Sequence, residues 1–240
     1  MNTLNDELQD LFLWWYGSTS ETRLALAAKP DLSEPCLLSS NSFKEMNVGK
    51  LDDAWIGRWF AKGEMTQRVD DTMKNRFEAT LQKASPLIDR TNIVSEKKLE
   101  LMHLWQILAL VVLLDQVPRN IYRGTSKAYE NDAIANKLAG YIFNKPDFMK
   151  QLPIHYQATI LICLCHSENA KDQKSLVDWI ESDSFSQYKT GNHKDYYSAL
   201  KSIIHKHAER IEIFGRFPER NKALGRKSTE SETAWVQELK

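Results

Sequence analysis

The most constraining feature of the sequence is a central segment whose apolar face widens until the segment is apolar on every side. Between residues 96 and 116, apolar side chains recur at the three- and four-residue spacing of one helical face: Leu101, Leu104, Leu108 and Val111. The face then broadens into an unbroken apolar run over residues 107–114. A helix without a polar face is one that other helices cover. We predict a central buried helix that ends before Pro118, because proline disfavours helical geometry in the preceding residue.

The rest of the chain also favours helices. It has only nine glycines, and strand-like alternation between turns is scarce. Periodic apolar faces predict further helices over residues 4–16, 51–61, 66–84, 127–143, 154–165, 170–182, 194–214 and 229–239. Residues 18–50 are rich in Ser, Asn and Pro, which predicts an irregular insertion. We therefore expect one all-α domain over residues 1–240.

Three prolines, Pro86, Pro118 and Pro153, are spaced at about the length of a helix-hairpin repeat. Their spacing favours antiparallel helical hairpins stacked as in tetratricopeptide-repeat proteins.

Composition narrows the range of partners and settings. The 32 basic and 32 acidic residues give a formal net charge of zero, so a whole-surface attraction to nucleic acid or to a membrane is not expected. No apolar run approaches the roughly 20 residues that span a bilayer, and the acidic start is unlike a secretory signal. Three cysteines at irregular spacing do not form a disulfide framework. A cytoplasmic, membrane-free protein is the expectation.

Two similar segments carry the candidate chemistry. The first corner, residues 114–126, contains Arg119-Asn120 after a proline, followed by Arg123 and hydroxyl residues. The second corner, residues 214–229, repeats this order around Arg220-Asn221. Both corners lie between predicted helices, where rigid elements often hold functional side chains.

The arginines of the corners predict a site for a small anionic molecule. A guanidinium offers a planar set of donors that matches carboxylate and phosphate. The predicted ligand-binding residues are Asp115, Gln116, Arg119, Asn120, Arg123, His207, Arg216, Arg220, Asn221 and Arg226. A purely structural interpretation is equally well supported, because arginine and asparagine also satisfy the orphan carbonyls at helix ends and pair with internal acids.

A second group could transfer protons. His166 and Glu168 lie between two predicted helices, and a histidine beside a carboxylate can act as a general acid or base near neutral pH. No spacing typical of a zinc site occurs, and neither a phosphate-binding glycine loop nor a dinucleotide motif is present. We therefore expect no metal and no cofactor.

The corners, together with flanking motifs, resemble a known family, the bacterial-type domain-of-unknown-function family 924. The similarity rests on Leu114-Asp115-Gln116-x-Pro118-Arg119-Asn120-x-x-Arg123, on Asp132, His166-Ser167-Glu168 and Gln173, and on Phe214-Gly215-Arg216-Phe217-Pro218-x-Arg220-Asn221-x-x-Leu224-Gly225-Arg226-x-Ser228-Thr229. It implies an all-helical fold similar to tetratricopeptide repeats, and no established activity. Ile213 and Glu219 depart from the family pattern, so we expect no ligand contact from them.

Two functions are favoured on these residues, and nucleic-acid binding through the basic side chains of residues 205–227 is a weaker third. One is binding of a small anion between the corners, with proton transfer by His166 and Glu168. The other is a helical-repeat adaptor whose concave face binds a protein segment while the Arg-Asn motifs are structural. The sequence leaves open whether the chain is an enzyme.

Overall fold

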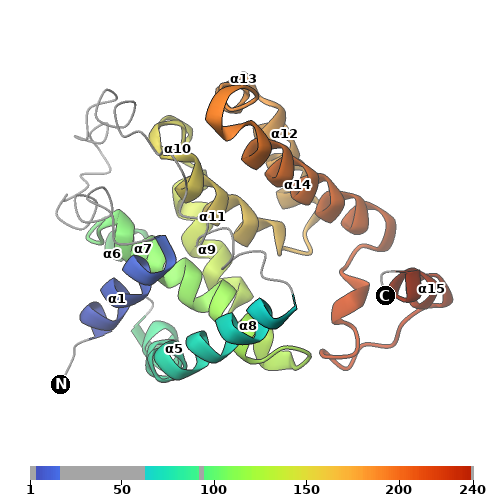
Figure 1. The fold of residues 1–240 in the computed structure, drawn as a ribbon, viewed down its shortest axis with the longest axis horizontal. Coiled ribbons are helices and arrows are strands. Elements are labelled where there is room, and N and C mark those ends of the chain that lie inside the picture. Colours follow the sequence, from blue (N-terminus) through green and yellow to red (C-terminus); the bar gives the residue numbers. More distant parts are fainter. Residues whose placement is uncertain (1–3, 17–62, 92–94, 239–240) are drawn as a thin grey trace.

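A computed structural model describes residues 4–16, 63–91 and 95–238, and every regular element in these ranges is helical (Figure 1). The all-α prediction is therefore confirmed for this part of the chain. The predicted insertion over residues 18–50 and the predicted helix over residues 51–61 lie outside the described residues.

The elements follow one another along the chain as α1 (Leu4–Tyr16), α5 (Glu64–Thr91), α6 (Glu96–Leu99), α7 (Leu104–Val111), the π-helical turn η1 (Val112–Gln116), α8 (Val117–Ile121), η2 (Ser126–Ala128), α9 (Asp132–Phe143), α10 (Pro146–Gln151), α11 (Ile154–Cys165), α12 (Ala170–Glu181), α13 (Asp183–Ser186), η3 (Gly191–His193), α14 (Lys194–Phe214), η4 (Pro218–Arg220) and α15 (Glu230–Glu238). The predicted bounds of α1, α11 and α14 are confirmed. α5 extends beyond its predicted end, and α9 begins later than predicted.

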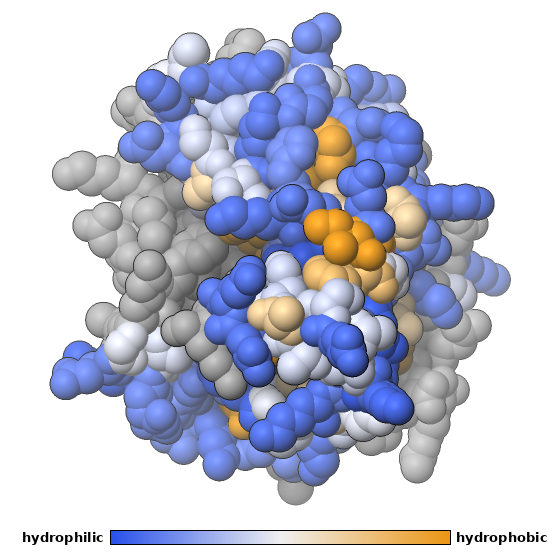
Figure 2. All heavy atoms as spheres, turned by 90° about the vertical axis from the view of Figure 1, so that its right-hand side faces the viewer, coloured by the Kyte–Doolittle hydropathy of each residue, from blue (hydrophilic) through white to orange (hydrophobic). Residues whose placement is uncertain are grey.

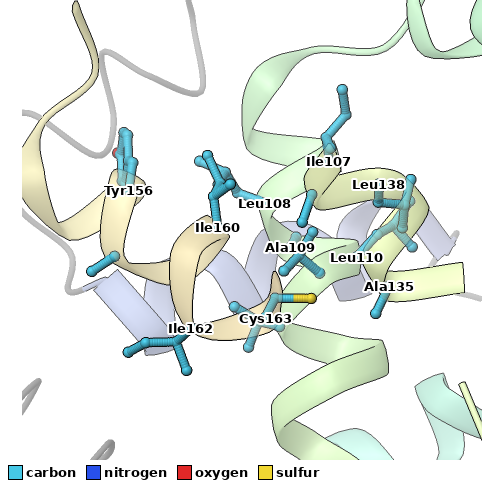
Figure 3. Close-up of a cluster of buried hydrophobic side chains, with 14 of the residues drawn as sticks. Ile107, Leu108, Ala109, Leu110, Ala135, Leu138, Tyr156, Ile160, Ile162 and Cys163 are labelled. Carbon is cyan, nitrogen blue, oxygen red and sulfur yellow. The ribbon is translucent and has the colours of Figure 1, made fainter. Parts of the chain in front are cut away.

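The core is built around α7, α9 and α11, which pack on one another. Figure 3 shows side chains from the three helices meeting between them, among them Leu108, Leu138 and Ile160. All three are fully buried. Every residue of α11 is buried, the polar His155, Gln157 and Thr159 included, so this helix lies at the centre of the fold.

Two further groups of helices cover this centre from different sides (Figure 1). α1 packs on α7 and α5, and α5 packs on α8. α12 and α14 pack on each other and on α11. Gly215 ends α14 with a φ of 68°, a left-handed conformation that glycine adopts without steric cost. The chain then passes through η4 to α15.

The prediction of one helix over residues 96–116 is wrong in two respects. The segment is divided into α6 and α7, and the helix does not end before Pro118 but continues through η1 into α8. Proline lacks an N–H, and its ring collides with the carbonyl four residues earlier in a regular helix. The wider turn of η1, in which the Val117 N–H bonds the Val112 carbonyl, lets the helix pass this point. Asp115 lies within that turn.

None of the described helices is both long and apolar enough to cross a membrane.

Candidate functional site

The two corners meet at the carboxylate of Asp132, the first residue of α9. Arg119 donates to both of its oxygens, from Nη1 to Oδ1 at 2.9 Å and from Nη2 to Oδ2 at 2.8 Å. Arg220 donates from Nη1 to the same Oδ2 at 3.1 Å. One carboxylate thus joins the first corner to the second. Segments that are distant in the sequence become two sides of one site.

Arg119 has no donor group left for a ligand at its Nη1 end. Besides Asp132, this nitrogen contacts the Asp115 carbonyl at 2.8 Å and Asp115 Oδ1 at 3.0 Å. The side chain is 15% exposed. Its ion pairs with Asp115 and Asp132 outweigh the effect of burial, and they raise the pKa of Arg119. Arg119 is a permanent cation that holds the site together.

Asp115 orients His166. Its Oδ1 lies 2.7 Å from Nδ1 of His166, and Gln116 donates to its Oδ2 at 2.5 Å. Burial alone would raise the pKa of Asp115, but the charge of Arg119 and the contacts with His166 and Gln116 lower it to about 2. The carboxylate is therefore ionised at neutral pH and only accepts hydrogen bonds. His166 must carry its proton on Nδ1, which leaves the lone pair on Nε2.

His166 itself is neutral near pH 7. Burial, followed by the charge of Arg119, lowers its pKa, and the opposing effect of Asp115 is smaller. The prediction paired His166 with Glu168, but the structure places Asp115 against His166. Glu168 turns away, accepting from the Phe217 N–H at 2.8 Å and from Arg226 at 2.7 and 3.0 Å.

His207 of α14 lies beside His166, with ring centroids 5.9 Å apart. Its Nδ1 is 2.8 Å from the Ile203 carbonyl, which can only accept, so Nδ1 carries the proton. Arg210 Nη2 lies 3.2 Å from the same nitrogen, but two donors form no hydrogen bond, and the shorter contact decides the tautomer. Burial, with a smaller effect of His166, lowers the pKa of His207 to about 3.

A pocket of about 330 Å³ opens between the corners. It is lined by residues from both corners, from η2, from the end of α11 and from α14: Arg119, Arg123, Gly124, Ala128, Tyr129, His166, His207, Glu219 and Arg220. This size is at the lower end of the range for small-molecule sites.

Arg220 is held rigidly in the wall of this pocket. Its guanidinium carbon lies 4.3 Å from the ring centroid of Phe217 and 5.0 Å from that of Tyr129. The side chain is only 10% exposed, and burial followed by the charge of Arg119 lowers its pKa. Among the described residues, Nε and Nη2 of Arg220 have no hydrogen-bond partner. These donors are fixed in direction but unused.

The remaining predicted residues of the first corner serve its geometry. Asn120 donates to the Gln116 carbonyl at 2.8 Å and accepts from Arg123 at the same distance. Arg123 also forms two hydrogen bonds with Asp70 of α5, at 2.7 and 2.9 Å. Its side chain is 53% exposed, at the mouth of the pocket.

The second corner is held by its own network. Arg216 donates to both oxygens of Glu232, at 2.6 and 2.8 Å, and Asn221 donates to Glu232 and Ser228. Thr229 and Glu232 form a capping box at the start of α15, with bonds of 2.7 and 3.2 Å. Arg226 binds Glu168. The predicted ligand residues Arg216, Asn221 and Arg226 therefore do not line the pocket.

Sequence reasoning missed the aromatic part of the site. Tyr129 lies between the Arg123 turn and Asp132, and its ring packs on both Arg119 and Arg220. In the sequence, only the position of Tyr129 in a polar turn could have indicated that it belongs to the site. Glu219, expected to make no ligand contact, lies in the pocket wall, where Arg210 holds its carboxylate at 2.5 Å. In the described part of the chain, no group of three or more His, Cys, Asp or Glu residues could hold a metal ion.

Comparisons with known proteins identify the family of the chain. A family model described as bacterial protein of unknown function (DUF924) matches residues 44–239, a range that contains both corners and every pocket residue. The chain belongs to this family. The solved structure of the protein of unknown function ATU0120 from Agrobacterium tumefaciens is similar, with a TM-score of 0.58 and 25% sequence identity. The match covers 78% of this chain and 92% of that chain. The search of curated proteins gave no match.

Proposed function

We propose that the pocket between the corners binds a small molecule through an anionic group, a phosphate or a carboxylate. The observation that carries this proposal is the state of Arg220. Asp132, Tyr129 and Phe217 fix its guanidinium, yet Nε and Nη2 have no partner among the described residues. Oxygen atoms of an anion are the acceptors that suit a preorganised guanidinium best.

The charges around Arg220 favour a small anion over a highly charged one. Arg119 and Arg220 are balanced by Asp115 and Asp132, and both histidines are neutral near pH 7. The pocket therefore carries no large excess of positive charge. Attraction depends on direct hydrogen bonds at short range, which a bound anion of one or two charges can make.

His166 gives the site its capacity for proton transfer. Its Nε2 lone pair and its hydrogen bond to an ionised Asp115 are the arrangement of a general base whose ring is oriented by a carboxylate. In this proposal, His166 and Asp115 carry out any acid-base step. Glu168 instead stabilises the second corner. Arg216, Asn221 and Arg226 are assigned to the corner itself.

The alternative of a protein-binding adaptor has weaker support. Figure 2 shows a mainly hydrophilic surface near the end of α14 and α15, with a small hydrophobic patch. The large hydrophobic side chains exposed among the described residues are Leu101, Ile213 and Leu224. So few exposed apolar side chains give a protein segment little surface to bind.

The test is ligand binding by matched arginine variants. Inorganic phosphate and succinate are titrated by calorimetry into the wild-type protein, into Arg220→Gln and into Arg216→Gln. Each variant loses an arginine of the second corner, but only Arg220 lines the pocket. We expect binding to be lost in Arg220→Gln and retained in Arg216→Gln. Arg220→Lys, which keeps a cation beside Asp132, serves if Arg220→Gln fails to fold. Equal binding by all proteins, or by none, would overturn the proposal.

A further inference from the structure

Three residues of the pocket, Arg220, His166 and His207, have nitrogens without a hydrogen-bond partner among the described residues, and these nitrogens are of two opposite kinds. Arg220 can only donate hydrogen bonds. The outer nitrogens of His166 and His207 can only accept, because the inner nitrogen of each ring carries the proton. Among the described residues, neither Nε2 has a hydrogen-bond partner. Ligand atoms that satisfy all three residues must therefore include acceptors and at least one donor.

The two histidine rings and Arg220 line the same pocket, and they are linked by ring contacts. The histidine rings are 5.9 Å apart, and the Phe217 ring contacts both His207, at 5.4 Å, and Arg220, at 4.3 Å. A single small group can thus face all three side chains within the pocket. The Tyr129 hydroxyl, in the same wall, can donate or accept.

We infer, resting on the proposed function, that the bound group is a phosphate that retains a proton, as inorganic phosphate or as a phosphate monoester. A monoester phosphate has its second pKa near 6, so about a quarter of the molecules keep a proton at pH 6.5 and about a tenth at pH 7. Its unprotonated oxygens accept from Arg220, and its P–OH donates to a histidine Nε2. An ionised carboxylate or sulfate has no proton to donate and leaves both lone pairs facing anionic oxygen.

Phosphate and sulfate provide the sharpest comparison, since both are small tetrahedral anions. Each is titrated by calorimetry into the wild-type protein at pH 6.5 and constant ionic strength. We expect phosphate to bind about tenfold more tightly than sulfate or better, because a site built to accept a hydrogen bond rejects an analogue that lacks the donor. Sulfate binding as tightly as phosphate overturns this inference and leaves the proposed function standing. If phosphate, sulfate and succinate all fail to bind, both this inference and the proposed function are overturned.

The histidine variants test whether the discrimination arises at the acceptors. His207→Asn keeps an amide that can donate to the Ile203 carbonyl but removes the ring's outer acceptor. His205→Asn is the control on the same helix, where the native ring pairs with exposed Glu181. We expect the preference for phosphate over sulfate to decrease in His207→Asn and to persist in His205→Asn. An unchanged preference in both variants contradicts the inference.

A measurement on the unaltered protein covers the case in which a variant fails to fold. Long-range ¹H–¹⁵N NMR spectra report which nitrogen of each imidazole carries the proton. We expect protonated Nδ1 and bare Nε2 in both His166 and His207, and a shift of the Nε2 signals on addition of phosphate. Protonated Nε2 in both rings overturns the inference.

Discussion

Arg119 and Arg220, from opposite corners, donate to the same Oδ2 of Asp132, at 2.8 and 3.1 Å. Both side chains also pack on the ring of Tyr129, at 5.5 and 5.0 Å. Two buried cations in such proximity repel each other, and the pKa of Arg220 is lowered by burial and then by Arg119. The shared carboxylate offsets this repulsion. The pocket therefore depends on Asp132.

Replacement of Asp132 by asparagine should destabilise the fold. The variant keeps the size of the side chain but leaves Arg119 and Arg220 without their common counter-charge. Since Asp132 is only 15% exposed, we expect the free energy of unfolding to fall by about 3 kcal/mol or more. Urea denaturation monitored by circular dichroism measures this change.

Asp147→Asn is the matched control. Asp147 is 93% exposed and lies 3.5 Å from Lys150, so its loss should change the free energy of unfolding by less than about 1 kcal/mol. If the free energy of unfolding falls by the same amount in both variants, Asp132 contributes no more to stability than an exposed acidic residue.

The all-α class and the bounds of α1, α11 and α14 could be read from apolar periodicity, because each of these helices buries a continuous stripe or its entire surface. The continuation of the helix past Pro118 could not be predicted in this way. The local effect of proline predicts that a helix ends there. In the folded chain, the π turn η1 instead joins α7 to α8, so the helix continues through Pro118. Such a turn has no sequence signature.

Acid should destabilise the protein through His207. Its pKa is about 3 in the folded chain, mainly because of burial, against 6.5 when unfolded. Between these values the unfolded chain binds more protons, so stability is highest above pH 6.5 and decreases as the pH falls. The slope is up to about 1.4 kcal/mol per pH unit for one histidine.

Urea denaturation at pH 7 and pH 5 measures the slope in the wild type, in His207→Asn and in the control His205→Asn. His166 and buried His155 also have lowered pKa values, so part of the acid sensitivity remains in every protein. We expect a smaller pH effect in His207→Asn alone. The same slope in all three proteins would mean that His207 is not buried as a neutral ring.

Glu168 should anchor the second corner rather than transfer protons. It binds Arg226 through both oxygens and accepts the Phe217 N–H. In Glu168→Gln the ion pair is lost, so we expect amide hydrogens of η4 and α15 to exchange about tenfold faster while those of α11 are unaffected. In the control Glu181→Gln, which breaks the exposed contacts with Lys201 and His205, exchange in η4 should stay as in the wild type. If amide exchange in η4 and α15 is the same in Glu168→Gln as in the wild type, Glu168 does not anchor the second corner.

Only part of the pocket lining could be predicted from the sequence, and the partner of His166 could not. The repeated Arg-Asn pattern identified the corners, and Arg119, Arg123, Arg220, His166 and His207 indeed line one pocket. Adjacency in sequence suggested Glu168 as the partner of His166, whereas the partner is Asp115, in a different helical segment. Chain neighbours at a helix end diverge in direction, and only the packing of α11 against η1 brings His166 to Asp115.

An NMR titration of isotope-labelled protein with inorganic phosphate tests directly whether an anion binds between the corners, because it locates the bound anion. We expect saturable shifts of the Arg220 Nε–H and of the His166 and His207 Nε2 signals, with one common affinity. The Arg216 Nε–H, held by Glu232, should stay in place. Shifts confined to exposed lysines, with Arg220 unaffected, would contradict an anion site between the corners.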